Sequence, residues 1–278
     1  MLTIRQARRD GRAQLHESPS PALDARLLLA HALGRDHAYL AAHDDEALTA
    51  AQAAAYAQLL ARAAAGEPIP YLLGRAPFFG LDFAVSPAVL IPRPETEQLV
   101  EAAIAWGRGR GPLRAVDVGT GSGCIAVALA RGLPAAAVAA VDTSAAALAV
   151  AAVNVARHAP GGVALIRGDL LAAVAPRLDL IAANLPYVAR SEWTALPDGV
   201  KSYEPALALD GGIDGLDIIR GLLSQAATRL RPGGLLLLEI GWRQGPAAAA
   251  LARAHFPTAR IEVRPDFAGH DRFVAVQT

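Results

Sequence analysis

The chain has 278 residues, of which 53% are hydrophobic and 19% charged, so it is long and apolar enough to bury a full core and is not intrinsically disordered. The 26 acidic and 26 basic residues cancel, which gives no support to a nucleic-acid-binding tail driven by bulk charge. One cysteine, Cys124, excludes an intrachain disulfide and a cysteine-rich zinc module, and the seven histidines show no paired metal spacing.

The first part of the chain, residues 1–75, is predicted to be entirely helical. One helix fits 21–34, with a proline at its start and a glycine at its end, and another fits 49–65. Residues 76–92 differ, because they contain prolines, aromatics and the alternating run Leu81–Val85. This pattern predicts a linker that contains a β-hairpin.

The remaining segment, 93–278, begins with a helix after Pro92-Arg93-Pro94 and then alternates between strands and helices. This order predicts an α/β fold with a mostly parallel sheet, helices on both faces and an antiparallel edge. The expected strands are 114–118, 137–141, 163–166, 178–183, 235–239, 260–263 and 272–276. The expected helices are 124–131, a helix that ends near 158, and 216–230, which a turn at 231–234 would end.

The strongest local motif joins a predicted strand to a predicted helix. The strand ends in Asp117, and the loop Gly119-Thr120-Gly121-Ser122-Gly123 follows. Glycines permit tight turns and close approach of a ligand, and the first N–H groups of the next helix point toward that ligand. A dinucleotide fingerprint reads GxGxxG, whereas this spacing is GxGxG with an acid before it. The acid repels a pyrophosphate and suits an ammonium group, such as the methionine part of S-adenosylmethionine; a glycine turn without a ligand is the competing interpretation.

Two more acids end the next two predicted strands. Asp142 can accept hydrogen bonds from both hydroxyls of a ribose, although it also suits a helix N-cap. Asp169 can accept from an adenine amino group or occupy a plain turn. Together with the glycine loop, these acids favour a bound nucleoside.

The segment Asn184-Leu185-Pro186-Tyr187 follows the fourth predicted strand, at the sheet edge where ligands of parallel sheets bind. The Asn184 side-chain carbonyl and the next main-chain carbonyl can accept both hydrogens of an NH2 group, and Tyr187 can lie over a planar amide or base. Holding both N–H bonds aims the weakly nucleophilic nitrogen at a methyl group, so positioning dominates and no strong base is needed. A structural β-turn is the competing interpretation of this tetrapeptide.

Over nearly its whole length the sequence resembles the release-factor glutamine N5-methyltransferase family (PrmC/HemK). The run Ile91-Pro92-Arg93-Pro94-Glu95-Thr96-Glu97 is particularly specific. The segments that carry the resemblance are Glu67–Gly74, Val85–Glu97, Asp117–Ile125, Asn184–Val188, Tyr203–Leu207 and Leu235–Gly241.

The resemblance implies a helical substrate-binding domain (1–75), a hairpin linker (76–92) and a Rossmann-like methyltransferase domain that uses S-adenosylmethionine and releases S-adenosylhomocysteine. It implies methyl transfer to the glutamine of the GGQ loop of peptide chain release factors. By this resemblance the glycine loop, Asp142, Leu170 and Asn184 bind the cofactor, and residues 184–187 bind the glutamine. The chain departs from the family at two positions: Leu185 stands where a proline is usual, and Leu170 where an aromatic is common.

Two other functions remain open at this point. An adenine-N6 methyltransferase on DNA or RNA could use the same clamp, and the Asn-Leu-Pro-Tyr form also occurs in ribosomal-RNA adenine dimethyltransferases. A non-catalytic module that binds release factors or the cofactor is supported only by Leu185. We expect a cytoplasmic monomer without a metal, a membrane segment or a direct nucleic-acid partner, because no targeting signal or long apolar run is present.

Overall fold

The computed structural model describes all residues, 1–278, and divides them into two compact units. The helical unit contains Met1–Arg75 and Pro197–Tyr203, and the sheet unit contains Ala76–Leu196 and Glu204–Thr278. Residues 197–203 thus belong to the helical unit although they fall inside the segment expected to form the methyltransferase domain. Within the helical unit, the Tyr203 hydroxyl donates a hydrogen bond to the carbonyl of Ala65 at 3.3 Å.

The helical unit is held by helix caps and one buried tyrosine. Thr49 forms a capping box at the start of its helix, and Gly34 ends another with φ +62°, as the sequence predicted. The hydroxyl of buried Tyr56 donates to main-chain carbonyls of two other helices, Ala7 at 3.3 Å and Ala25 at 3.2 Å. The helices are α1 (Ile4–Gln14), α2 (Pro21–Leu33), α3 (His37–Ala42), α4 (Ala50–Ala64), α5 (Ile69–Leu73) and α9 (Asp198–Tyr203).

A two-stranded hairpin, β1 (Arg75–Phe78) and β2 (Leu81–Ala84), begins one residue before the predicted linker 76–92 and ends before the linker does. Its turn places Phe79 at φ 50° and Gly80 at φ 73°, as a two-residue hairpin turn requires. The Asn154 side chain holds the second strand, because its oxygen accepts from Ala84 N at 2.7 Å and its nitrogen donates to Ala84 O at 2.9 Å.

The sheet unit is built on seven strands in the order β5-β4-β3-β6-β7-β9-β8. All neighbouring pairs from β5 to β7 are parallel, and β9 pairs antiparallel with both β7 and β8, so the expected parallel sheet with an antiparallel edge is confirmed. The strands are β3 (Arg114–Val118), β4 (Ala137–Asp142), β5 (Val163–Arg167), β6 (Leu178–Ala183), β7 (Leu230–Glu239), β8 (Arg260–Pro265) and β9 (Asp271–Gln277).

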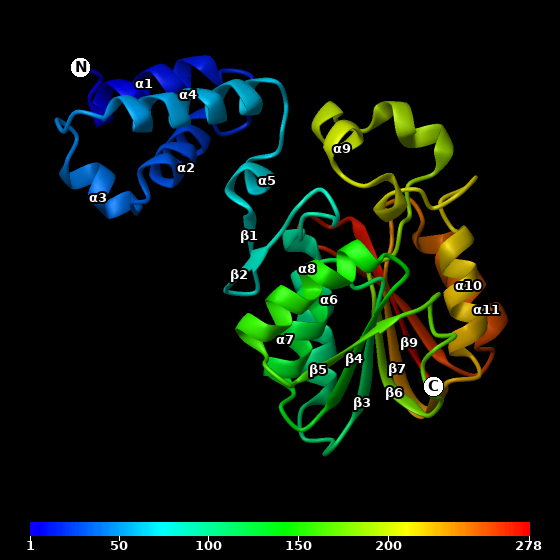
Figure 1. Cartoon of the computed structure of the whole chain (residues 1–278). Coiled ribbons are helices and arrows are strands. Elements are labelled where there is room, and N and C mark those ends of the chain that lie inside the picture. The colour runs from blue at the N-terminus through cyan, green and yellow to red at the C-terminus, as the bar shows by residue number, and fades with distance from the viewer. The chain divides into compact units, whose positions relative to one another are not determined.

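Helices cover both faces of this sheet (Figure 1). Alternate residues along the central strands point to opposite faces, so Leu180 and Ala182 pack into one core cluster while Ile181 and Ala183 pack into the other. On the first face lie α6 (Pro94–Gly107), α7 (Cys124–Gly132) and α8 (Ala145–His158); on the second lie α10 (Asp217–Ala226) and α11 (Gly245–His255).

One expected boundary was wrong. The sequence predicted a helix to residue 230 and a turn at 231–234, but α10 ends at Ala226 and β7 begins at Leu230. The glycine and proline residues form an irregularity inside the strand: Leu178 pairs with Leu230, yet Leu180 pairs with Leu235. Extra residues on β7 are therefore looped out, with Gly233 at φ +78°, rather than used to end the helix.

Candidate active site

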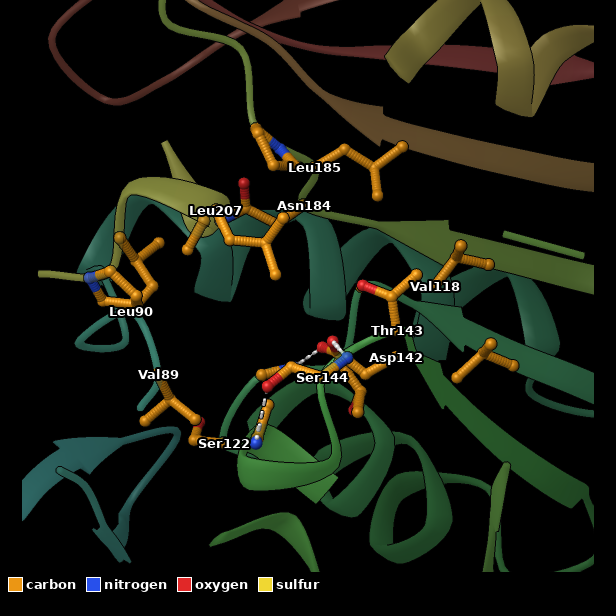
Figure 2. Close-up of a pocket in the computed structure, with 18 of the residues that line it drawn as sticks. Val89, Leu90, Val118, Ser122, Asp142, Thr143, Ser144, Asn184, Leu185 and Leu207 are labelled. Atoms are coloured by element: carbon orange, nitrogen blue, oxygen red, sulfur yellow. Dashed lines mark hydrogen bonds between the residues drawn. The ribbon is translucent and has the colours of Figure 1, made fainter. Parts of the chain in front are cut away.

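A pocket lies at the carboxyl ends of β3, β4 and β6, the edge where the sequence placed the candidate residues. Its lining includes four groups of residues that end or follow strands: the glycine loop after β3, residues 142–144 at the end of β4, residues 168–170 after β5, and residues 184–186 after β6. Figure 2 shows Asn184 on one side of the pocket and Asp142 with Ser144 on the other.

The glycine loop has a conformation that only glycine adopts easily. Gly119, Gly121 and Gly123 have φ values of 72°, 53° and 81°. A Cβ on Gly121 would meet nothing within 4 Å, so this part of the loop offers its main chain to the pocket. Gly119, Thr120, Gly121 and Ser122 line the pocket, whereas Gly123 is not among the lining residues.

Asp117 lies beneath the glycine loop and does not line the pocket. Its side chain is fully buried, and Oδ2 accepts hydrogen bonds from Thr120 Oγ1 at 2.6 Å and from Ala126 N at 3.1 Å. Burial raises the pKa of Asp117 to about 7, and the two hydrogen bonds oppose this effect. Oδ1 is buried without a hydrogen-bond partner. The acid therefore braces the loop from below, and a direct contact with a ligand stays a prediction.

Asp142 is fastened by two main-chain N–H groups. Its Oδ2 accepts from Gly121 N at 2.9 Å, and its Oδ1 accepts from Ser144 N at 2.9 Å. The N-cap of α8 is Ser144, whose hydroxyl accepts from Ala147 N, so Asp142 is not the cap that the competing interpretation required. Each carboxylate oxygen has a further lone pair, which leaves two acceptor positions for a ligand in the pocket.

The third group of lining residues follows β5. Asp169 is exposed and lines the pocket. Leu170 also lines it and has φ +50°, a left-handed backbone conformation that is uncommon for leucine. Both predicted residues therefore lie at the site, and their contacts with a cofactor stay predictions.

The tetrapeptide after β6 divides between the pocket and the core. Asn184, Leu185 and Pro186 line the pocket. The Leu185 side chain is only 3% exposed, packs in the core cluster and approaches Gly119, where a Cβ would lie 2.8 Å from Leu185 Cδ2. Leucine at this position therefore adds apolar packing under the loop where the family usually has a proline.

Tyr187 is not among the lining residues. Its hydroxyl points to the carboxylate of Glu239, with 3.5 Å between the oxygens, and its carbonyl accepts from Gln244 Nε2 at 2.9 Å. Burial raises the pKa of the Tyr187 hydroxyl, and the charge of Glu239 adds to that effect. The expected stacking of this ring on a substrate amide has no counterpart in the pocket lining and stays a prediction.

Two residues at the site escaped the sequence analysis. Thr96 on α6 lines the pocket, and Glu239 ends β7; both are buried. Thr96 shares the buried face of α6 with Leu99 and Val100, so helical spacing from the PRPETE segment was the available signal. Neighbouring Glu97 instead accepts a hydrogen bond from Phe79 N in the hairpin.

Arg93 also lines the pocket, and Glu204 fixes it there. The Glu204 carboxylate is buried, forms a hydrogen-bonded ion pair with the Arg93 guanidinium and accepts from Ile91 N at 3.2 Å. Glu204 thus braces the segment that leads into α6.

The fold and this pocket define the class of Rossmann-like methyltransferases. The family model "Methyltransferase small domain" matches residues 110–197, and "PrmC N-terminal domain" matches residues 6–74. A methyltransferase from Pyrococcus furiosus has the same fold, with a TM-score of 0.54 and 18% identity over 72% of this chain and 90% of that one. A 16S rRNA methyltransferase from T. thermophilus, solved with AdoMet and guanosine, has a TM-score of 0.52 and 21% identity. That match covers 73% of this chain and 49% of the other.

Curated relatives named release factor glutamine methyltransferase align with almost the whole chain. The Bordetella pertussis protein is 46% identical over 91% of this chain and 93% of its own length. The Moorella thermoacetica protein is 45% identical over 98% of this chain and 97% of its own length. The Nitratidesulfovibrio vulgaris protein is 41% identical over 98% of this chain and 92% of its own length. The chain belongs to the release factor glutamine methyltransferase family, so the predicted resemblance is confirmed. No helix is long and apolar enough to cross a membrane.

Proposed function

We propose that this protein transfers a methyl group from S-adenosylmethionine to N5 of the glutamine in the GGQ loop of peptide chain release factors, with S-adenosylhomocysteine as product. Family membership supports the reaction class. The observation that carries the proposal is that Asn184 lines the same pocket as the glycine loop and Asp142. The proposed acceptor for the amide and the proposed site for the nucleoside therefore share one cavity.

The residues of this pocket fit the proposed cofactor. The main chain at Gly121 is open to the pocket, and Asp142 has two free acceptor positions for a ribose. Asp169 and Leu170 line the same pocket and are the proposed contacts of the adenine. Buried Asp117 beneath the loop favours a cationic ligand above it when its carboxyl is ionised. When bound, S-adenosylmethionine supplies a methyl group on a sulfonium, which is a good leaving group.

The chain's own contribution is positioning. Asn184 Oδ1 and the main-chain carbonyl of Leu185 accept hydrogen bonds from the two N–H groups of the glutamine amide. These two bonds direct the nitrogen lone pair toward the methyl group. Buried apolar groups, including Leu185, limit the access of water to the reacting nitrogen. The amide proton leaves after the N–C bond forms and the S–C bond breaks, so no base has to act first.

A labelling experiment tests this function. The purified protein is incubated with methyl-labelled S-adenosylmethionine and a release factor, and mass spectrometry locates the label. We expect the label on the GGQ glutamine, and none when that glutamine is replaced by alanine. Label at another residue, or transfer to adenine in DNA or RNA but not to the release factor, would refute the proposal.

Partner recognition and assembly belong to the same proposal. Because the helical unit carries equal numbers of acidic and basic side chains in residues 1–75, we propose that it binds the release factor through shape and local contacts rather than net charge. We also propose that the protein acts as a cytoplasmic monomer without a metal. Light scattering coupled to gel filtration tests the oligomeric state.

A further inference from the structure

A chain of hydrogen bonds runs from the proposed amide clamp into the core. Asn184 Nδ2 donates to Thr96 Oγ1 at 3.1 Å, and the Thr96 hydroxyl donates to Glu239 Oε2 at 2.6 Å. The other carboxylate oxygen, Oε1, faces the Tyr187 hydroxyl at 3.5 Å. Thr96 is 2% exposed and Glu239 is 1% exposed, so water does not compete for these groups. The four side chains come from α6, β7 and the segment after β6.

The chemistry of these groups fixes which atom donates and which accepts in each hydrogen bond of this series. Thr96 has a single hydroxyl proton. The Glu239 carboxylate is the strongest acceptor within reach of it, and the bond between them is short. Thr96 Oγ1 can therefore offer only lone pairs to Asn184, and the atom of Asn184 that faces it must be the donor, Nδ2. Because a carboxamide has its oxygen and nitrogen on opposite sides, Oδ1 is turned away from Thr96 and is left for a ligand.

We infer that Thr96 and Glu239 are positioning residues that set the orientation of the Asn184 carboxamide, so that the pocket receives its oxygen and not its NH2 group. This inference deepens the proposed function and rests on it. The reversed carboxamide would oppose its own NH2 to the NH2 of a glutamine, two donors facing each other. The site would then select a ligand oxygen, as in glutamate, instead of an amide nitrogen.

This order of donors and acceptors requires that Glu239 is ionised. A protonated Glu239 can donate to Thr96, which frees the Thr96 proton for Asn184 Oδ1 and allows both carboxamide orientations. Burial raises the pKa of Glu239 to about 7; nearby Glu95 acts in the same sense, while Arg272 and the two hydroxyl hydrogen bonds act against it. The charge of Glu239 also acts weakly on the Cys124 thiol, whose pKa burial raises to about 12, so this thiol stays neutral.

Variants of the full-length protein test the inference. Thr96→Val keeps the shape of the side chain and removes the hydroxyl, Thr96→Ser keeps the hydroxyl, and Thr228→Val is a matched control because Thr228 is exposed and does not line the pocket. We expect Thr96→Val to lower kcat for the release factor about tenfold or more, the scale of a lost buried hydrogen bond, with the cofactor dissociation constant unchanged. Thr96→Ser should recover most of that loss.

Two further measurements separate positioning from a merely structural role. A peptide with glutamate in place of the GGQ glutamine should inhibit Thr96→Val more strongly, relative to the glutamine peptide, than it inhibits the unaltered protein. The kcat of the unaltered protein should fall as the pH drops through about 7, and Glu239→Gln should lack this step. Equal kcat and equal glutamate discrimination in Thr96→Val and Thr228→Val would overturn the inference.

An activity-independent readout keeps the two proposals distinct. Nuclear magnetic resonance of the Asn184 side-chain NH2 should show slow hydrogen exchange in the unaltered protein and in Thr96→Ser, and fast exchange in Thr96→Val. If the unaltered protein transfers no methyl group but this pattern holds, the proposed reaction fails and the orientation stands. If exchange is the same in all three proteins, the orientation is not set by Thr96.

Discussion

S-Adenosylhomocysteine that lacks one ribose hydroxyl should bind the unaltered protein more weakly than the complete ligand does. In Asp142→Ala the missing hydroxyl should make no difference. The Asp142 carboxylate already accepts two main-chain N–H groups, from Gly121 and Ser144, each at 2.9 Å. It keeps one lone pair on each oxygen, enough for the two ribose hydroxyls. A hydrogen bond to a charged group is worth about 1.5–3 kcal/mol, so each missing hydroxyl should weaken binding roughly 10- to 150-fold.

Asp142→Ala alone cannot measure this contact. The substitution also leaves the N–H groups of Gly121 and Ser144 without their acceptor, and a loosened loop weakens every ligand of the pocket. A double cycle cancels that common effect, because it compares how much each protein loses when the ligand loses one hydroxyl.

Calorimetry with S-adenosylhomocysteine and its 2′-deoxy and 3′-deoxy analogues completes the cycle. We expect a coupling energy of about 1.5–3 kcal/mol per hydroxyl between Asp142 and the ribose. Asp169→Ala is the matched control, since Asp169 lines the same pocket and is not expected to touch the ribose. Equal losses in the unaltered protein and in Asp142→Ala would refute the ribose contact and leave Asp142 as a brace of the loop.

Three other outcomes follow from the same pocket. Asn184→Ala should largely keep cofactor binding, measured by calorimetry, and lose about 10²-fold or more in turnover, because it removes a positioning contact. Gly119→Ala should lower the free energy of unfolding by about 1–3 kcal/mol in urea titrations, since φ is +72° and the new Cβ would lie 2.8 Å from Leu185. Burial raises the folded-state pKa of Asp117 from 3.8 to about 7, so its stabilising contribution is present at low pH and is lost as the pH rises through about 7. Between pH 5 and pH 8 the unaltered protein should therefore lose stability relative to Asp117→Asn; a constant difference would contradict the raised pKa.

The sequence could predict where the site lies because the candidate residues end consecutive strands. An apolar run that stops at Asp142 or Asn184 marks the end of a buried strand, and carboxyl ends of parallel strands meet at one edge of the sheet. The glycine loop was also predictable, since its three glycines permit the tight turn that the structure forms with positive φ values. These features are local, so one stretch of sequence is enough to find each of them.

The residues that orient the clamp could not be found in this way. Thr96 and Asn184 are 88 positions apart, and their contact depends on how α6 packs against the sheet. A threonine on the buried face of a helix, or a glutamate at the end of a strand such as Glu239, is typical of many structural positions. Asp117 is buried and Tyr187 points away from the pocket because of how side chains pack around the strand ends. The periodicity of the sequence does not describe this packing.

Packing also explains how the clamp and the nucleoside site stay in register. Beyond Leu185, the carbonyl of Asn184 lies 3.6 Å from where a Cβ of Gly119 would stand, so the segment after β6 and the glycine loop after β3 touch directly. These strands are neighbours in the sheet, with Val118 paired to Ala183. Leu185 lacks the rigidity of the usual proline, but its buried side chain packs against Gly119 from the core side and restrains the same main chain. A change at either contact should therefore move the proposed methyl donor relative to the amide nitrogen. Turnover, which we propose depends mainly on positioning, should then fall before either ligand is lost from its site.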